Sequence, residues 1–317
     1  MKILITGGTG FVGKRLTEIL LSDGNYVRCI VRESSNISNL DKRIEILRGN
    51  LFDNSFFKSA LLDIDVVFHL AALRGEKYLP YKEYEKANVL LTGKLLEASR
   101  NIRKFIFCST VGVMGFGTDL NENSPLKPKG NYHISKARAE ELCRKYENCI
   151  IVRPSIVYGP GDIDGFLYKL IRLIKRKRFL ITGNGKNKIH MVHIDNLCQG
   201  LIKVGLNGKT GETFIIADRN SLTLSEIIEI IGKELNVRIP SLMIPRVLAF
   251  LVAFIYQKFY SLIFPEKEPF VSLSKVDIMS LNQDFNVSKA LSMGYNPEIE
   301  IQKGIEETVR EYKKREK

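Results

Sequence analysis

A tyrosine and a lysine four positions apart are the side chains of this sequence best suited to acid–base chemistry. Tyr132 and Lys136 lie in the segment Tyr-His-Ile-Ser-Lys, at the predicted start of a helix. Positions i and i+4 share one face of a helix, so the lysine ammonium lies near the tyrosine phenol. A nearby cation favours the phenolate and lowers the tyrosine pKa toward working pH, as a general acid–base requires. Taken alone, the pair is also typical of many ordinary helices.

Two neighbouring hydroxyl side chains extend this set. Ser109 and Thr110 follow an apolar run, residues 105–108, that predicts a buried strand. A hydroxyl at the end of a strand can hydrogen-bond the oxygen of a reacting alcohol or carbonyl group. With the tyrosine–lysine pair, such a hydroxyl would complete an acid–base site.

A glycine-rich turn near the N-terminus indicates the cofactor of such a site. Residues 2–6 are an apolar run typical of a buried parallel strand, and residues 14–21 have the spacing of an amphipathic helix. Between them, Gly7 allows a tight turn, Gly10 lets the backbone approach a pyrophosphate, and Gly13 lets the helix pack close to the strand. The helix N-terminus offers free N–H groups to the phosphates. Strand, glycine turn and helix together predict a dinucleotide site.

Strand and helix signals alternate through the first half of the chain, which is typical of a parallel doubly wound sheet with helices on both faces. We therefore expect an α/β fold of the Rossmann type. An NAD(P)-binding domain would cover residues 1–160, and the chain would return to it around 189–217. A smaller, mainly helical substrate lobe would cover most of residues 161–317 and lie across the carboxyl edge of the sheet, where such sheets bind ligands. The expected strands are 2–6, 26–31, 44–47, 65–70, 105–108, 149–152 and 214–217, and the expected helices are 14–21, 55–62, 82–100, 135–146, 166–175, 195–204, 224–235 and 301–313.

The composition is typical of a globular protein without a nucleic-acid or metal signature. The 317 residues are 44% hydrophobic and 26% charged, with a net charge of +13. The basic residues are spread along the chain apart from a cluster at 169–178, which suits either a solvated surface or the attraction of a phosphate-bearing substrate. His69, His133, His190 and His193 lack a compact ligand set, so no metal site is predicted. Five cysteines without a C-x-x-C pair, and no signal peptide, predict a cytoplasmic location.

Residues 243–264 are unusually apolar. Their uninterrupted apolar run, residues 247–256, is shorter than the roughly 20 residues that a bilayer core requires, and Gln257 and Lys258 follow it. A helix in the core or in an interface is the favoured interpretation. The alternatives are a helix on a membrane surface, with contact through residues 247–264, and one lining an apolar substrate entrance.

In their order along the chain, the glycine turn, the serine–threonine pair and the Tyr-x-x-x-Lys pair resemble the extended branch of the short-chain dehydrogenase/reductase superfamily. That branch contains nucleotide-sugar epimerases and dehydratases, and reductases of the dihydroflavonol-reductase and 3β-hydroxysteroid-dehydrogenase kind. The resemblance extends over nearly the whole chain. Further matching segments are 49–53, 69–72, 87–93, 153–161, 190–196 and 285–297.

The resemblance implies a role for each matching residue. Tyr132 would be the general acid–base, and Lys136 would hold the nicotinamide ribose and depress the tyrosine pKa. Thr110 would supply the catalytic hydroxyl, with Ser109 as the neighbour to test beside it. Asn50 stands where the family usually has an aspartate bordering the adenine, and it can still form hydrogen bonds. The implied cofactor contacts are Gly7, Thr9, Gly10, Phe11, Val12, Gly13, Arg32, Asn50, Leu51, Leu70, Ala71, Ala72, Asn88, Tyr132, Lys136, Pro154, Ser155, Ile156 and Val157.

The end of the second predicted strand bears on the choice between NAD and NADP. An NAD site usually has an acidic residue there, and Glu33 comes one position late for that role. Arg32 precedes it and can pair bidentately with a 2′-phosphate. The sequence therefore favours NADP, with NAD as the alternative.

Two activities fit these residues. The first is an NAD(P)-dependent epimerase acting on a nucleotide sugar through a transient keto intermediate. The second is an NADP-dependent reductase or dehydrogenase of an apolar carbonyl or alcohol. A dehydratase would need an acidic residue beside the catalytic hydroxyl, but Val111 and Gly112 follow Thr110. A cofactor-binding scaffold without activity is disfavoured by the intact catalytic set. The expected partner is a small-molecule substrate and not a nucleic acid, and a homodimer stays an open alternative.

Overall fold

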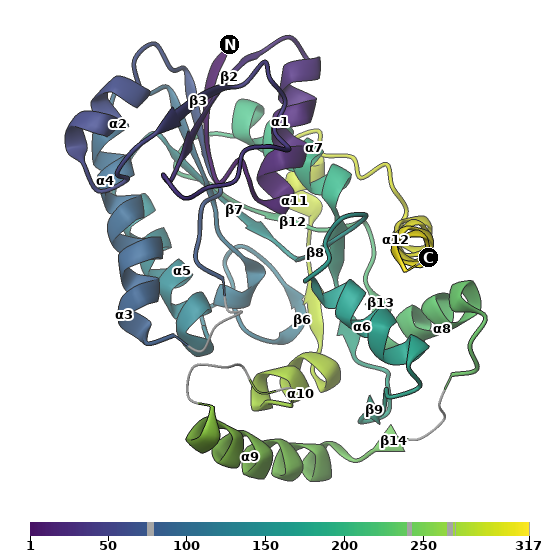
Figure 1. The fold of residues 1–317 in the computed structure, drawn as a ribbon. Coiled ribbons are helices and arrows are strands. Elements are labelled where there is room, and N and C mark those ends of the chain that lie inside the picture. The colour runs from purple at the N-terminus through teal and green to yellow at the C-terminus, as the bar shows by residue number, and fades with distance from the viewer. Residues whose placement is uncertain (75–78, 240–242, 265–268, 270, 317) are drawn as a thin grey trace.

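A parallel sheet of seven strands forms the centre of the structure, a computed structural model that describes residues 1–74, 79–239, 243–264, 269 and 271–316 (Figure 1). The strand order is β12-β7-β5-β4-β1-β2-β3, and each neighbouring pair is parallel. This is the doubly wound α/β fold that the sequence predicts. The strands are β1 (Lys2–Thr6), β2 (Tyr26–Val31), β3 (Glu45–Arg48), β4 (Val66–His69), β5 (Lys104–Cys108), β7 (Cys149–Pro154) and β12 (Thr213–Ile216).

The strand order reverses at β1, and this switch point defines where a ligand binds in such a sheet. β1 pairs with β2 on one side and with β4 on the other, and Thr6 lies level with His69. Ile3, Leu4 and Ile5 are fully buried, as expected for a strand covered on both faces. The glycine-rich turn follows β1 directly, so it lies at the carboxyl edge beside the switch point.

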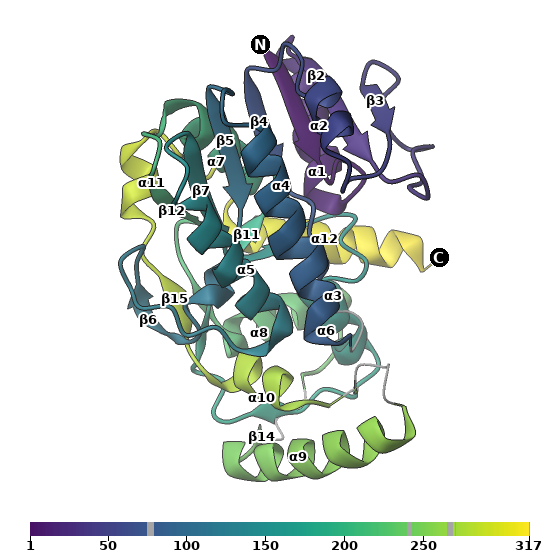
Figure 2. The same cartoon turned by 90° about the vertical axis from the view of Figure 1, so that its left-hand side faces the viewer.

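Helices cover both faces of the sheet, as the alternation of strands and helices predicts. α1 (Phe11–Ser22) and α7 (Ile194–Asn207) pack together on one face and share its apolar core. α2 (Asn54–Ala60), α4 (Leu91–Ala98) and α5 (Gly130–Cys143) cover the other face (Figure 2). The sheet is therefore buried between two layers, and only its carboxyl edge is free to meet the lobe.

The stretch that the sequence predicts as one helix over residues 82–100 consists of three helical segments. α3 (Tyr81–Tyr84) leads into a π-helix, η1 (Glu85–Leu90), which continues as α4. Local propensity does not distinguish a π-helix from an α-helix, and such segments occur frequently at functional sites. Here the π-helix contains the buried Asn88.

Helix α5 begins at Gly130 and ends at Cys143, whereas the sequence places it at residues 135–146. Gly130 has a positive φ of 79°, and Lys129 before it is extended. A glycine followed by an asparagine is more typical of a turn than of a helix start, which explains the error. The earlier start places Tyr132 inside the first helical turn.

The lobe has a core of its own, built mainly from three helices. α6 (Phe166–Lys175) and α8 (Leu224–Leu235) have the bounds that the sequence predicts, and α12 (Ile301–Arg315) packs on both. The chain returns to the central sheet for β12, and α11 (Ser288–Ser292) packs against that strand. The remaining strands, which pair outside the central sheet, are β6 (Gly117–Leu120), β8 (Ile156–Tyr158), β9 (Ile181–Thr182), β10 (Lys188–Ile189), β11 (Met191–His193), β13 (Leu222–Thr223), β14 (Met243–Ile244) and β15 (Gln283–Phe285).

The apolar segment forms α9 (Arg246–Ile263), which does not lie in the core, so that part of the expectation is wrong, while a helix in an interface stays a prediction. Ala253 is its one buried residue. The helix lies along the margin of the lobe and packs on α10 (Leu273–Ser280), as both views show (Figures 1 and 2). Among the described residues, α9 is the one helix that is long and apolar enough to cross a membrane.

Candidate active site

The glycine-rich turn has the close backbone contacts that a dinucleotide site requires. Gly7 has a positive φ of 76°, and a Cβ on it would lie 2.7 Å from the Ala71 backbone nitrogen. The Gly10 N–H donates to the Gly7 carbonyl at 3.0 Å. A Cβ on Gly13 would lie 2.1 Å from the same carbonyl oxygen. The turn therefore admits only glycine at positions 7 and 13, and it brings the N-terminus of α1 to the carboxyl edge of the sheet.

The rest of the predicted pyrophosphate contacts lie around this turn. Thr9 is exposed, and Phe11 and Val12, at the start of α1, are partly exposed. Gly10 is the N-cap of α1 and has no side chain to satisfy the first N–H groups of the helix. Free N–H groups at a helix N-terminus attract phosphate oxygens. These residues fit the phosphates of a dinucleotide.

His69 fastens the loop that follows β4. Its Nδ1 lies 2.6 Å from Thr6 Oγ1, and its Nε2 lies 2.8 Å from Thr92 Oγ1. The Thr6 hydroxyl also accepts from the Ala71 N–H at 3.1 Å. Burial lowers the pKa of His69 to about 3, so the ring is neutral. Leu70, Ala71 and Ala72, which the resemblance assigns to the cofactor, follow it as a partly exposed loop.

Asn88 connects this loop to the catalytic helix. Its Oδ1 accepts from the Leu73 N–H at 2.7 Å, and its Nδ2 donates to the Leu73 carbonyl at 3.0 Å and to Ser135 Oγ at 2.9 Å. Ser135 in turn donates to the Tyr132 carbonyl at 2.7 Å. Asn88 can make this bridge because the π-helix turns it toward α5. The sequence suggests the residue through the resemblance, but not the π-helix that positions it.

Tyr132 and Lys136 lie on the same side of α5, next to Cys108 at the end of β5. The Lys136 ammonium is 1% exposed and lies 4.0 Å from the centre of the Phe107 ring. Burial lowers the pKa of Lys136 to about 8, opposed by Cys108, Cys143 and Glu140. The ammonium is therefore held out of solvent against the Phe107 ring.

The pKa of Tyr132 differs from the prediction made from its spacing to Lys136. Burial raises it to about 12, Cys108 adds to the increase, and the cation that lowers it is Arg74. In this protein the phenol therefore holds its proton at neutral pH. Arg74 is an exposed residue of the loop after β4, and no motif in the sequence marks it as a neighbour of Tyr132.

Ser109 and Thr110 are adjacent in sequence but have different environments. The buried Ser109 hydroxyl donates to Glu140 Oε1 at 2.6 Å. Thr110 is partly exposed and caps a 3₁₀ turn, η2 (Val111–Val113), by accepting from the Gly112 N–H at 3.2 Å. This turn packs on α5, since a Cβ on Gly112 would lie 2.3 Å from His133 Nε2. Thr110 is thus the hydroxyl with access to a substrate near Tyr132.

A buried ion pair lies below the catalytic helix. Glu140 is fully buried, and Arg153 reaches it with two hydrogen bonds, Nε to Oε1 at 3.0 Å and Nη2 to Oε2 at 2.7 Å. Together with the Ser109 contact, the pair joins α5 to β5 and β7. The sequence analysis did not single out Glu140, because an acidic residue one turn after Lys136 looks like an ordinary surface residue.

The segment after β7 offers an unpartnered polar group at the same edge. Ser155 is 5% exposed, and its hydroxyl has no hydrogen-bond partner among the described residues. Its N–H donates to the Ile216 carbonyl at 3.0 Å. Buried polar groups normally have partners, so this hydroxyl fits contact with a ligand. Pro154 is buried beside it, and Ile156 and Val157 of β8 are partly exposed.

Two arginines lie at the ends of the neighbouring strands β2 and β3. Arg32 is exposed, as a phosphate-binding residue would be. Arg48, at the end of β3, donates from Nη1 to the carbonyls of Glu33 at 2.7 Å, Ser35 at 3.1 Å and Arg32 at 3.4 Å. Arg48 thus holds the loop that carries Arg32, and the sequence analysis missed it.

The predicted adenine contacts follow the same edge. Asn50 is exposed, and its Oδ1 accepts from the Phe52 N–H at 2.9 Å. Leu51 beside it is partly exposed. Asn50 and Leu51 are therefore accessible to a ligand at the end of β3.

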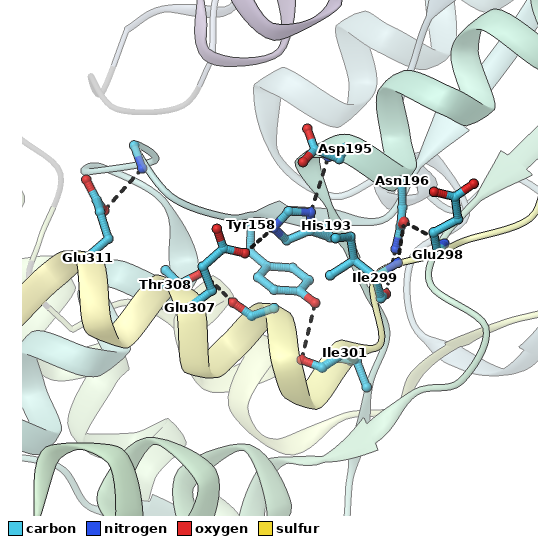
Figure 3. A network of polar contacts seen from close by, with 12 residues as sticks. Tyr158, His193, Asp195, Asn196, Glu298, Ile299, Ile301, Glu307, Thr308 and Glu311 are labelled. Atoms are coloured by element: carbon cyan, nitrogen blue, oxygen red, sulfur yellow. Dashed lines mark hydrogen bonds and ion pairs between the residues drawn. The ribbon is translucent and has the colours of Figure 1, made fainter.

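A polar network ties this edge to the lobe (Figure 3). Tyr158 lies between the His193 ring and α12, and its hydroxyl donates to Asp218 Oδ2 at 3.0 Å. Asp218 also accepts from the His193 N–H and from Asn196 Nδ2, and burial raises its pKa to about 6. Asn196 extends the network to the backbone of Ile299. Its Oδ1 accepts from the Ile299 N–H, and its Nδ2 donates to the Ile299 carbonyl. His193 is therefore a structural residue between the sheet edge and the lobe.

Comparison with known proteins identifies the family. The family model described as "NAD dependent epimerase/dehydratase family" matches residues 3–217. The chain belongs to this family of extended short-chain dehydrogenases, and it is an NAD(P)-binding epimerase or oxidoreductase.

Three similar proteins illustrate the range of activities in this family. A 4-hydroxy-2-methyl-3-oxo-4-farnesyl-3,4-dihydroquinoline-1-oxide ketoreductase of Stigmatella aurantiaca is 27% identical, over 96% of this chain and 95% of the relative. An N-acetyl-alpha-D-glucosaminyl-diphospho-ditrans,octacis-undecaprenol 4-epimerase of Escherichia coli O157:H7 is 28% identical, over 97% and 94%. The crystal structure of a UDP-glucuronic acid 4-epimerase from Bacillus cereus in complex with NAD has a TM-score of 0.79 at 24% identity, over all of both chains. The structure supports the fold only.

Proposed function

We propose that this protein is an NAD(P)-dependent epimerase of a nucleotide sugar, which oxidises one sugar carbon to a ketone and reduces it from the other face. The observation that carries the proposal is that Thr110, and Tyr132 on the helix packed beside it, lie at the carboxyl edge of the sheet that also bears the glycine turn. The family model and the similarity to an epimerase of a diphosphate-linked sugar support it. The same proposal places the protein in the cytoplasm, where nucleotide sugars are available.

The residues of the edge have distinct tasks in this reaction. Tyr132 accepts the proton of the substrate hydroxyl as the ketone forms, and it returns that proton when the ketone is reduced. Thr110 donates a hydrogen bond to the same oxygen and holds it near the phenol. When bound in its oxidised form, the nicotinamide would accept the hydride from the substrate carbon, return it later, and place a positive charge beside Tyr132. A positive charge is needed, because burial, together with Cys108, raises the pKa of the phenol to about 12.

We further propose NADP as the preferred cofactor. Arg32 supports it, because an exposed guanidinium at the end of β2 can pair with a 2′-phosphate. Arg48 supports the NADP preference indirectly, because its hydrogen bonds to backbone carbonyls hold the loop that carries Arg32. The solved UDP-glucuronic acid 4-epimerase is named as a complex with NAD, which makes NAD the alternative cofactor.

A hydride-retention experiment tests the epimerase. The protein as purified is incubated, without added cofactor, with UDP-glucose or UDP-N-acetylglucosamine carrying deuterium at C4, and the products are separated by chromatography. We expect the C4 epimer to form with the deuterium retained, because the same hydride leaves and returns. Tyr132→Phe is the control and should form none. Failure to interconvert either sugar, with NADPH consumed on addition of a ketone, would overturn the proposal.

A reductase of an apolar carbonyl is the second candidate, and α9 is the observation that favours it. The helix exposes a large apolar surface in the lobe, and a relative that matches over the whole chain is named as a ketoreductase of a farnesyl-bearing compound. In that reaction Tyr132 would act as the acid alone, in agreement with its raised pKa. NADPH oxidation measured with farnesyl-bearing ketones distinguishes this candidate, since an epimerase shows no net consumption of cofactor.

A further inference from the structure

Helix α9 packs one narrow stripe, centred on Ala253, against α10 and exposes apolar side chains over the rest of its surface. Val247 is 82% exposed and Leu262 is 74% exposed, and residues 250–252 and 254–256 are exposed as consecutive triplets. Three consecutive helical residues point in three directions, so the exposed surface is wider than the single stripe of an amphipathic helix. Contiguous apolar patches of this size mark a surface that meets another molecule or a membrane.

The connections of α9 show that it lies along a surface and does not cross it. Before the helix, β14 pairs with β9 of the lobe. In the middle of the helix, Gln257 Oε1 accepts from the Leu273 N–H of α10 at 3.2 Å. A helix crossing a bilayer has no folded lobe bonded to its centre, whereas a helix lying in the interface plane can bury one side in lipid and keep the other against protein. The 18 residues of α9 would extend roughly 27 Å along that plane.

The charges near α9 fit an anionic surface. Residues 243–264 contain two cations, Arg246 and Lys258, and no acidic residue. The segment 175–178 is Lys-Arg-Lys-Arg and exposed, and it comes directly before β9, the partner of β14. Lys175 pairs with Glu316, while residues 176–178 form no ion pair among the described residues. A basic segment beside an apolar helix is the combination that binds anionic lipid headgroups.

One carboxylate connects α9 to the catalytic helix. Asp277 of α10 accepts from Arg246 Nη2 at 3.0 Å and from Lys129 Nζ at 3.2 Å. Lys129 is the N-cap of α5, three residues before Tyr132. The carboxyl ends of the central strands also point toward the side of the molecule on which α9 lies (Figure 1). A surface that holds α9 therefore lies on the side of the molecule toward which the carboxyl edge of the sheet faces (Figure 1).

From these observations we propose that α9, together with the basic segment 175–178, docks the protein on an anionic phospholipid bilayer, with the helix lying in the headgroup plane. The bilayer is favoured over a second copy of the chain, because a contact with one other helix would cover a single stripe and leave the rest of this wide exposed apolar surface in water. The proposal does not depend on which reaction Tyr132 performs.

Vesicle sedimentation with the full chain tests the docking. The protein is centrifuged with sucrose-loaded vesicles of phosphatidylcholine, with or without 30 mol% phosphatidylglycerol (roughly the anionic content that attracts basic segments). We expect binding to the anionic vesicles that falls at least about tenfold in 0.5 M salt, because headgroup charge is then screened. Sedimentation at the level of a vesicle-free control would overturn the proposal.

A matched pair of substitutions locates the contact. Leu262→Glu places a charge on α9, and Leu62→Glu places the same charge at a comparably exposed leucine, 66% exposed, outside α9. We expect at least about tenfold weaker vesicle binding for the first and unchanged binding for the second. Arg176→Gln combined with Arg178→Gln should weaken binding to anionic vesicles alone. Thermal unfolding checks that each variant is folded, and equal binding by both leucine variants would contradict the assignment to α9.

Light scattering of the protein in detergent-free buffer examines the alternative occupant. A monomer in solution supports the proposal, because α9 is then uncovered and available to bind lipid. A dimer that Leu262→Glu dissociates, with no loss of vesicle binding in that variant, would show that a second copy covers the helix and would overturn the proposal.

Discussion

The catalytic edge and helix α9 differ in which side chains they expose to solvent. At the edge, charged and polar groups such as Lys136, Glu140 and His69 are buried, each 1% exposed or less. On α9, large apolar side chains are exposed and one small residue, Ala253, is buried. The difference teaches that the two regions are shaped for different surroundings, a polar ligand in the first case and an apolar medium in the second.

The two regions also differ in how their side chains are held. Glu140, Ser109 and Arg153 form a closed network in which each group has a partner. Leaving a buried charge unpaired is costly, so this network fixes the position of α5. The exposed apolar side chains of α9 are held by no such network among the described residues. Asp277 connects the helix to the catalytic edge. Substitutions at the edge should therefore affect catalysis and folding, and substitutions on α9 should affect neither in solution.

The largest effect is expected for Tyr132→Phe. The change removes the acid–base and leaves the ring that packs beside His133. We expect turnover to fall by about 10²–10⁴-fold, while the dissociation constant of the dinucleotide changes little. Steady-state kinetics and a cofactor titration measure the two quantities. A variant that kept the rate of the unmodified protein would remove Tyr132 from the mechanism.

Glu140→Ala sharpens the contrast in stability. It leaves the Arg153 guanidinium buried and unpaired, so the free energy of unfolding should fall by about 3–5 kcal/mol. Glu141→Ala changes an exposed residue of the same helix and should stay within about 0.5 kcal/mol. Urea unfolding followed by circular dichroism provides both values. Similar losses for the two variants would show that the buried network does not fix α5.

Acid should act on the edge and spare α9, which carries no titratable group near neutral pH. Because the pKa of His69 is about 3 in the folded chain and 6.5 ordinarily, protons bind preferentially to the unfolded chain as the pH falls. Its contribution to stability is present above pH 6.5 and is lost progressively toward pH 3, by up to about 1.4 kcal/mol per pH unit. His69→Gln should flatten this dependence in urea midpoints measured from pH 7 to 5. An unchanged slope would contradict the buried neutral ring.

The smallest effect is expected where the 2′-phosphate of NADP would bind, at the end of β2. Arg32→Ala should weaken NADP by about tenfold, the value of one charge-assisted contact, and should leave NAD nearly unchanged. Arg48→Ala should act in the same direction but less, because Arg48 donates to the backbone carbonyls of the loop that carries Arg32. Isothermal titration with both dinucleotides measures the ratio. Equal losses for NADP and NAD would remove the argument for NADP.

The same comparison explains what the sequence could predict. The central strands, α6 and α8 follow from apolar periodicity, because those residues are buried and their pattern is set by the core. For α9 the same apolar composition favoured a helix in the core or in an interface, and the core part was wrong, because composition does not say what an apolar helix contacts. The cofactor and catalytic motifs could be predicted because the glycine-rich turn and the Tyr-x-x-x-Lys pair rarely occur together in proteins with other functions.

Other features of the site depend on contacts between distant segments. The π-helix at Asn88, the partner of Glu140 and the proximity of Arg74 to Tyr132 arise only after folding. The raised pKa of Tyr132 is one result, since it depends on burial and not on spacing to Lys136. The start of α5 was misplaced because Gly130 and Asn131 are typical turn residues.

The most direct test of the epimerase is to identify the nucleotide that the protein carries. The protein is purified without added cofactor and denatured, and the released small molecules are identified and quantified by mass spectrometry. The account predicts NADP or NAD at close to one per chain, because an epimerase regenerates its own cofactor and has no need to release it. An empty site that binds NADPH reversibly would contradict the epimerase and would favour the reductase of an apolar carbonyl.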